Sequence, residues 1–211
     1  TAGTYTVMAS DNTTTCGNTT AGSATVVINT APAMFSVVGG GNYCAGGAGV
    51  HVGISGSTTG VNYSLYKGFS LVATKPGTGS PIDFGAQVAA GSYTVVATNA
   101  TTGCQSTMTG TATIVVNAVV TPSITISTPS GDTVCEGTIV NYSATTTNGG
   151  SAPTYQWTVN GALAGVGDAY SYSPANGDVV NVTLTSSATC ATPVSVSASM
   201  TMNVDPNKNP A

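Results

Sequence analysis

Hydrophobic and polar residues alternate with a period of two along much of this chain. The clearest run is residues 194–204. One face of this run holds Val194, Val196, Ala198, Met200, Met202 and Val204, and the other face holds only Ser, Thr and Asn. Because successive side chains of a strand point to opposite faces, the run predicts a strand that is buried on one side.

Further segments show the same alternation and are predicted to be strands. Their expected inward positions are Val50, Val52 and Ile54; Tyr63 and Leu65; Tyr93, Val95 and Ala97; Ala112, Ile114 and Val116; Val140, Tyr142 and Ala144; Tyr155, Trp157 and Val159; and Val180, Val182 and Leu184. Turn-forming pairs such as Asn160-Gly161 separate these runs. Since the usual helix formers are scarce, the pattern predicts an all-β protein.

Residues 2–29 and 90–117 repeat one another. The two segments align without a gap at a constant offset of 88 residues, and about half of their positions are identical. Residues 1–30 are therefore expected to be the C-terminal part of an incomplete repeat, whose front lies upstream or in another molecule. The complete repeats are predicted at 31–118 and, in a diverged form, at 119–206, with a linker at 207–211.

Each complete repeat has close to the ~100 residues of an immunoglobulin-like sandwich. The predicted fold class is thus all-β, with tandem immunoglobulin-like β-sandwiches and one incomplete sandwich at the N-terminus. The core tryptophan typical of such sandwiches is assigned to Trp157. Tyr93 and its repeat counterpart Tyr5 each follow a Gly at a strand start, where a tyrosine-corner hydrogen bond is expected.

The five cysteines fit the repeat frame. Cys44 and Cys135 stand near the front of the two complete repeats, and Cys104 and Cys190 stand near the back. We predict the disulfides Cys44–Cys104 and Cys135–Cys190, one in each repeat, and an unpaired Cys16 whose partner would belong to the absent front. Disulfides indicate an oxidising, extracellular compartment.

The charge of the chain excludes several partners. Only 5% of the residues are charged, the net charge is −4, and the three basic residues are Lys67, Lys75 and Lys208. Nucleic acid is excluded because phosphate contacts need clusters of Lys and Arg. No apolar run is long enough to insert directly into a membrane. Low charge also leaves little repulsion between neighbouring copies.

The repeat motifs resemble those of giant cell-surface proteins of Bacteroidota, including gliding-type adhesins exported by the type IX secretion pathway. The resemblance rests on residues 43–47, 60–66, 77–80 and 91–99 of the first complete repeat and on residues 134–137, 153–157 and 176–178 of the second. It implies secretion, display at the cell surface and a role in adhesion or gliding motility. It carries over no catalytic residue.

Few side chains are candidates for chemistry. His51 is the single histidine and is expected on an outward, solvated face. The acidic residues are dispersed beside Gly and Asn, where they cap turns, so no metal site and no cofactor are predicted. Tyr66 and Phe69 form a candidate patch for a ligand or for self-association, because Tyr66 should point away from the core.

These observations predict a structural repeat segment of an extracellular cell-surface adhesin or filament, without catalysis. Its expected partners are other copies or adjoining repeats of the same protein, and surface polysaccharide is a further candidate. The alternative is a carbohydrate-binding accessory module of a secreted enzyme, which would bind sugar through Tyr66 and Phe69. An enzyme proper is disfavoured because neither paired catalytic carboxylates nor a metal cluster is visible.

Overall fold

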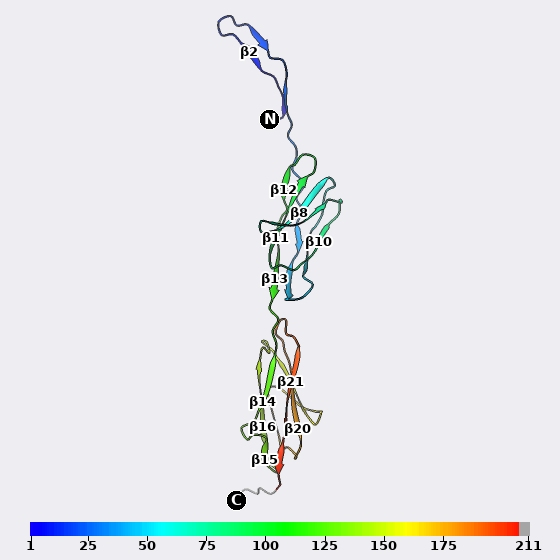
Figure 1. Cartoon of the computed structure of the whole chain (residues 1–211), viewed down its shortest axis with the longest axis vertical. Coiled ribbons are helices and arrows are strands. Elements are labelled where there is room, and N and C mark those ends of the chain that lie inside the picture. The colour runs from blue at the N-terminus through cyan, green and yellow to red at the C-terminus, as the bar shows by residue number, and fades with distance from the viewer. Residues whose placement is uncertain (207–211) are drawn as a thin grey trace. The chain divides into compact units, whose positions relative to one another are not determined.

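The computed structural model describes residues 1–206, so the linker predicted at 207–211 lies outside the described residues. The chain forms two compact units (Figure 1). The first takes Thr1–Asn42 and Ala48–Val115. The second takes Tyr43–Gly47 and the chain from Val116 onward. The short segment Tyr43–Gly47 therefore belongs to the second unit, although the sequence places it in the first complete repeat.

The first unit contains the two sheets of a sandwich. One sheet has the order β5 (Val37–Gly39), β7 (Val50–Ile54) and β10 (Ile82–Gln87). The other has the order β9 (Ser70–Pro76), β8 (Val61–Lys67), β11 (Gly91–Asn99), β13 (Ala112–Asn117) and β6 (Gly41–Cys44), with β12 (Gln105–Thr107) also paired to β11.

The second unit repeats this strand order. One sheet is β14 (Ser123–Ser127), β16 (Val140–Thr147) and β19 (Ala169–Tyr172). The other is β18 (Ala162–Val166), β17 (Thr154–Val159), β20 (Val179–Thr185) and β21 (Ser195–Thr201), and β15 (Thr133–Cys135) pairs in parallel with β22 (Asn203–Asp205). This arrangement is that of an immunoglobulin-like sandwich. The all-β prediction is confirmed for residues 1–206, which contain no helix.

The predicted inward positions form the cores. Tyr63, Leu65 and Val95 are completely buried in the first unit. In the second unit Trp157 is completely buried, and its Nε1 donates a hydrogen bond of 2.8 Å to the carbonyl of Gly167. Val194 is the exception, because it is 54% exposed and precedes the first paired residue of β21.

Four aromatic side chains pack together in the core of the second unit: Tyr142, Trp157, Tyr170 and Tyr172. Tyr142 and Trp157 lie with their ring centroids 6.1 Å apart, and Tyr170 and Tyr172 stack at 5.4 Å. Burial raises the pKa of Tyr172, and the charges of Tyr142 and Asp178 act in the same direction. Burial likewise raises the pKa of Tyr142.

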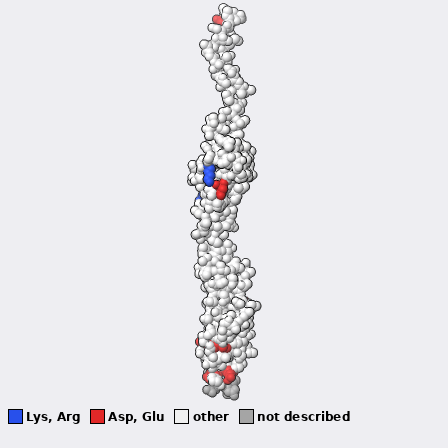
Figure 2. All heavy atoms as spheres, turned by 90° about the vertical axis from the view of Figure 1, so that its right-hand side faces the viewer, with Lys and Arg blue, Asp and Glu red and all other residues white. Residues whose placement is uncertain are grey.

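Hydroxyl pairs connect neighbouring strands at the surface. Ser64 and Thr74 Oγ atoms lie 2.9 Å apart, as do those of Ser127 and Ser143, and Thr185 and Ser195 lie 3.2 Å apart. Figure 2 shows only small groups of charged atoms on an otherwise uncharged face. Hydroxyl groups thus provide cross-strand contacts that ion pairs provide in more highly charged sheets.

Residues 1–29 form a ribbon of two short strand pairs, which we call the N-terminal ribbon. Its strands are β1 (Gly3–Tyr5), β2 (Met8–Ser10), β3 (Gly17–Thr19) and β4 (Ala24–Val26). β1 pairs with β4 and β2 with β3, in the same register that β11 has with β13 and β12, shifted by 88 residues. The ribbon therefore has the strand pairing of the last strands of the first complete repeat, β11 to β13.

Candidate functional site

The structure pairs the cysteines differently from the sequence-based prediction. Cys44 is bonded to Cys190, with Cα atoms 5.5 Å apart, while Cys16, Cys104 and Cys135 carry free thiols. The predicted pairs Cys44–Cys104 and Cys135–Cys190 are therefore wrong. The free thiol of Cys16 is exposed, and those of Cys104 and Cys135 are partly exposed.

Strand direction explains why Cys135 cannot reach Cys190. Cys135 pairs with Asp205 at the end of β22, whereas Cys190 precedes Ser195 at the start of β21. At about 3.3 Å per residue, the extended run from Ser195 to Asp205 puts on the order of 30 Å between these two ends of the sandwich. A disulfide requires Cα atoms within about 7 Å of each other.

The same argument separates Cys44 from Cys104. The residue after Cys44, Ala45, donates its N–H to the carbonyl of Asn117 at the end of β13. Cys104 lies at the other end, where its carbonyl accepts from the N–H of Asn99, the last residue of β11. β11 has nine residues, so the two cysteines are on the order of 25 Å apart.

The N-terminal ribbon exposes the side chains that its counterpart buries. Tyr5 is 49% exposed and Val7 is 66% exposed, whereas their counterparts Tyr93 and Val95 are 1% and 0% exposed. Val26 of the ribbon is 46% exposed, whereas its counterpart Ile114 is 1% exposed. The ribbon thus presents an apolar face whose chemistry matches the interior of a sandwich.

The turn chemistry of the two hairpins is nevertheless the same. Tyr5 Oη donates to the carbonyl of Thr1 at 2.7 Å, and Tyr93 Oη donates to that of Ala89 at 2.7 Å. Both predicted tyrosine corners are confirmed. The local hydrogen bond of the tyrosine corner is therefore the same in the exposed ribbon and in the buried hairpin.

Asp11 caps the turn of the N-terminal ribbon as Asn99 caps that of the counterpart. Its Oδ1 accepts from the N–H groups of Thr13 and Thr14 at 2.7 and 3.0 Å. Asn99 Oδ1 accepts from Thr101 and Thr102 at the same offset. The two backbone hydrogen bonds hold the pKa of Asp11 below its usual range.

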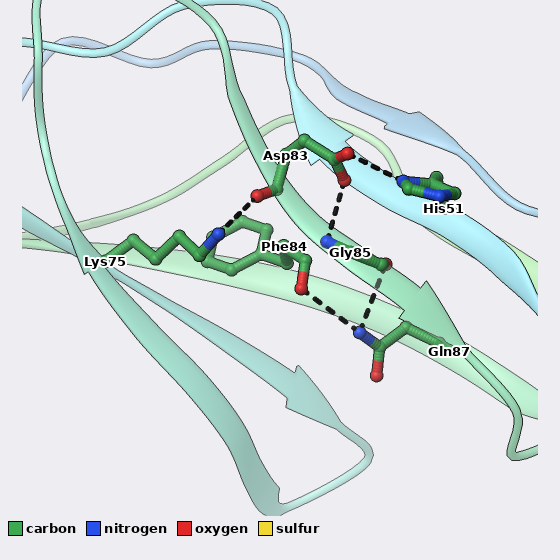
Figure 3. Close-up of polar contacts among 6 residues, drawn as sticks. All are labelled: His51, Lys75, Asp83, Phe84, Gly85 and Gln87. Atoms are coloured by element: carbon green, nitrogen blue, oxygen red, sulfur yellow. Dashed lines mark hydrogen bonds and ion pairs between the residues drawn. The ribbon is translucent and has the colours of Figure 1, made fainter.

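His51 is exposed, as expected, but it has a partner that sequence reasoning missed. Its Nδ1 lies 2.6 Å from Oδ2 of Asp83, which comes from β10 beside the His51 strand β7 (Figure 3). A hydrogen bond from the N–H of Gly85, followed by that from His51, holds the pKa of Asp83 below its usual range. Lys75 Nζ donates to the carbonyl of Asp83 at 2.7 Å.

Solvent exposure limits what this polar cluster can do. The side chains of His51 and Asp83 are 69% and 58% exposed. Water therefore competes for every donor and acceptor in the pair, and an exposed pair of this kind contributes little to stability. Its geometry is that of a surface contact between two neighbouring strands.

Tyr66 and Phe69 occupy the hairpin that joins β8 to β9. Phe69 is fully exposed, with a relative exposure of 105%, and Tyr66 is half-buried. Tyr66 lies on the outer face opposite Thr94, while its neighbour Leu65 is buried. Sequence reasoning thus identified the direction of Tyr66 correctly.

Among residues 1–206, no three His, Cys, Asp or Glu side chains come together in a group that could hold a metal ion. No helix in this part of the chain could cross a membrane.

No protein-family model matches the chain, and no curated protein matches it either. Among solved structures, it is similar to the fibronectin(III)-like modules of Clostridium thermocellum CbhA, with 14% identity, a TM-score of 0.33, and coverage of 81% of this chain and 95% of that one. The N-terminal four Ig domains of Dscam1 isoform 4.44 give 13% identity, a TM-score of 0.37, and coverage of 96% and 54%.

A third similar structure contains three N-terminal domains of the bacteriophage RB49 outer capsid protein Hoc, with 14% identity, a TM-score of 0.33, and coverage of 81% of this chain and 59% of that one. This chain spans little more than half of the Dscam1 and Hoc structures. The immunoglobulin-like class stated above rests on the strand order and burial in the chain itself.

Proposed function

We propose that this chain is a structural segment of an extracellular array of immunoglobulin-like repeats, which acts as a cell-surface adhesin or filament and has no catalytic role. The observation that carries the proposal is the apolar face of the N-terminal ribbon. Tyr5 and Val7 are exposed where Tyr93 and Val95 are buried by the front of their own repeat. The ribbon is thus built to be covered by the front of a sandwich of this kind.

Two further features support an extracellular array. The Cys44–Cys190 disulfide fits an oxidising compartment. The repeat motifs resemble those of Bacteroidota surface proteins, which favours export by the type IX pathway and a role in adhesion or gliding.

The array architecture is tested by adding the strands that are proposed to pack against the N-terminal ribbon. A copy of residues 31–88 is placed directly before Thr1, because residue 1 is the counterpart of residue 89 in the repeat frame. We expect the backbone amides of β1 and β4 to exchange hydrogen as slowly as those of β11 and β13, measured by mass spectrometry. Fast exchange in the ribbon of this extended chain, with the added segment itself protected, would overturn the proposal.

A matched control distinguishes packing of the added segment against the ribbon from a simple effect of the longer chain. The same extension carries Val52→Asp and Leu65→Asp in the added segment, since both residues are completely buried in the first unit. This extension should leave the ribbon amides in fast exchange, because two charged side chains cannot enter an apolar core.

The surface role is tested on cells of the source organism. Antibodies raised against the whole chain should label intact, unpermeabilised cells, and label should disappear after the gene is deleted. Label confined to permeabilised cells would reject surface display.

The second candidate function is carbohydrate binding, favoured by the full exposure of Phe69. An exposed aromatic ring can stack on the apolar face of a sugar. Binding on a glycan array that Phe69→Ala abolishes, and that Phe35→Ala in the same sandwich leaves intact, would support this function. Absence of any glycan signal with the whole chain rejects it.

A further inference from the structure

We infer that the free cysteines Cys104 and Cys135 each form a disulfide with a cysteine of an adjoining repeat of the same kind. Cys135 corresponds to Cys44, and Cys104 corresponds to Cys190, in the bond seen between Cys44 and Cys190. This inference rests on the proposed repeat array and identifies how its repeats are joined. A front cysteine, of the Cys44 type, bonds the back cysteine, of the Cys190 type, of the next repeat.

Cys135 occupies the same place in its repeat as Cys44 does. The N–H of Ala45 donates to Asn117 O at 2.8 Å, and the N–H of Glu136 donates to Asp205 O at 3.3 Å. Asn117 and Asp205 are 88 residues apart, as the repeat requires.

The turns after the two front cysteines also agree. The N–H of Gly47 donates to Cys44 O at 2.9 Å, and the N–H of Thr138 donates to Cys135 O at 3.1 Å. Both cysteines therefore end a short strand that pairs with the last strand of its sandwich. One of them is bonded and the other is free.

Cys104 likewise matches Cys190. Next to Cys190, the N–H of Thr192 donates to Val120 O at 2.9 Å. Next to Cys104, Ser106 Oγ donates to Pro32 O at 2.8 Å. Pro32 is the counterpart of Val120 in the repeat frame, so the segment that enters each repeat passes its back cysteine in the same way.

The carbonyl of Asn29 marks where the partner of Cys104 belongs. Asn29 is the counterpart of Asn117, whose carbonyl accepts from Ala45, the residue next to the bonded Cys44. In the ribbon this carbonyl lies 3.8 Å from Cys104 Sγ. A front segment bound to Asn29 as Ala45 is bound to Asn117 would bring its cysteine to Cys104.

The thiol of Cys135 is free and partly exposed. The next residues in the chain, Glu136 and Gly137, line a hollow of about 500 Å³ together with Pro174 and Val204. The loop of a following repeat that carries a back cysteine would approach from this end of the sandwich.

The bond forms by thiol–disulfide exchange with a small disulfide as the oxidant. The thiolate of one cysteine attacks oxidised glutathione and releases one glutathione thiol. The second cysteine thiolate attacks the mixed disulfide and releases the other. The two cysteine thiols lose two protons and two electrons, and the glutathione disulfide gains them.

The extended chain with a copy of residues 31–88 before Thr1 tests Cys104. It is incubated with oxidised glutathione, alkylated with iodoacetamide and mapped by mass spectrometry without reduction. We expect the added Cys44 copy bonded to Cys104, native Cys44 still bonded to Cys190, and Cys104 alkylation reduced at least tenfold against the natural chain. Replacing the added Cys44 copy by Ser should restore alkylation of Cys104.

A second extension tests Cys135. A further copy of residues 119–206 follows Pro206, and the expected product joins Cys135 to the added Cys190 copy. Cys104 or Cys135 that stays fully alkylated, or that bonds to a cysteine of its own repeat, overturns the inference. If the ribbon amides are protected while Cys104 stays free, only the disulfide inference fails, whereas unprotected ribbon amides reject the array itself.

Discussion

The N-terminal ribbon and residues 90–117 are one sequence pattern in two environments. Their strand registers agree residue by residue, and both contain a tyrosine corner. Yet Tyr5 is 49% exposed and Tyr93 only 1%. Strand pairing and turn structure are therefore set by the hairpin itself, whereas burial depends on the remaining strands of the sandwich.

This difference separates two contributions to stability. Hydrogen bonds along a two-stranded ribbon are made in water and leave it marginally stable. Removal of apolar surface from water makes the larger contribution to the free energy of folding, about 25 cal/mol per Å² of apolar surface buried. Substitutions at counterpart positions can measure the two contributions separately.

The largest contrast is expected between Tyr93→Ala and Tyr5→Ala. Tyr93→Ala should lower the free energy of unfolding of the first unit by about 3–5 kcal/mol, because it leaves a cavity in a closed core. Tyr5→Ala should leave it unchanged. Urea unfolding followed by circular dichroism measures both variants.

An internal reference is available for this experiment. Trp157 is the single Trp of the chain and lies in the second unit, so its fluorescence transition should stay in place in both variants. Equal losses for Tyr5→Ala and Tyr93→Ala would show that the ribbon is as well packed as its counterpart, contrary to the comparison.

The next largest effect is expected at the bonded cysteine. Cys44→Ser should lower the free energy of unfolding of the second unit by about 2–4 kcal/mol, because the disulfide restricts the unfolded chain. Cys16→Ser in the ribbon should have no effect. Trp157 fluorescence in urea, with and without a reductant, measures the change, and a Cys44→Ser chain as stable as the oxidised natural chain contradicts it.

The smallest effect is expected at the capping residue that differs between the two hairpins. The pKa of Asp11 is lowered in the folded turn, so its stabilisation is present above the unfolded pKa of about 3.9 and is lost as the pH falls through the folded value. The amide resonances of Thr13 and Thr14 should shift in this range, whereas those of Thr101 and Thr102 should not.

The corresponding variant is Asp11→Asn, which installs the residue found at position 99. It should keep the cap and remove the pH dependence. A titration that persists in Asp11→Asn would assign it to another group.

The strands and the cores could be predicted from the sequence because burial on one face imposes a period of two. This rule located Leu65, Val95 and Trp157 in the core. It was wrong at Val194, because the alternating pattern begins one residue before the first paired residue of β21, where the side chain is still exposed.

The cysteine pairs could not be predicted in the same way. The prediction paired the two cysteines of each complete repeat, because this leaves only Cys16 without a partner. The front cysteine and the back cysteine of one repeat, however, lie at opposite ends of the sandwich, as the direction of the strands requires. The extended run through β21 and β22 separates Cys190 from Asp205, beside which Cys135 lies.

The contact between His51 and Asp83 was missed for a related reason. The two residues are 32 positions apart and meet because β7 and β10 are neighbours in one sheet. Periodicity gives the face of each side chain, but the order of strands in a sheet depends on the whole sandwich.

The hydroxyl pairs between strands have a consequence for the conditions the protein can tolerate. The contacts of Ser64 with Thr74, and of Ser127 with Ser143, carry no charge. Dissolved ions do not screen them, and acid or alkali within the ordinary range does not titrate them. The sheets should keep these surface contacts equally well in fresh water, brine and mildly acidic surroundings.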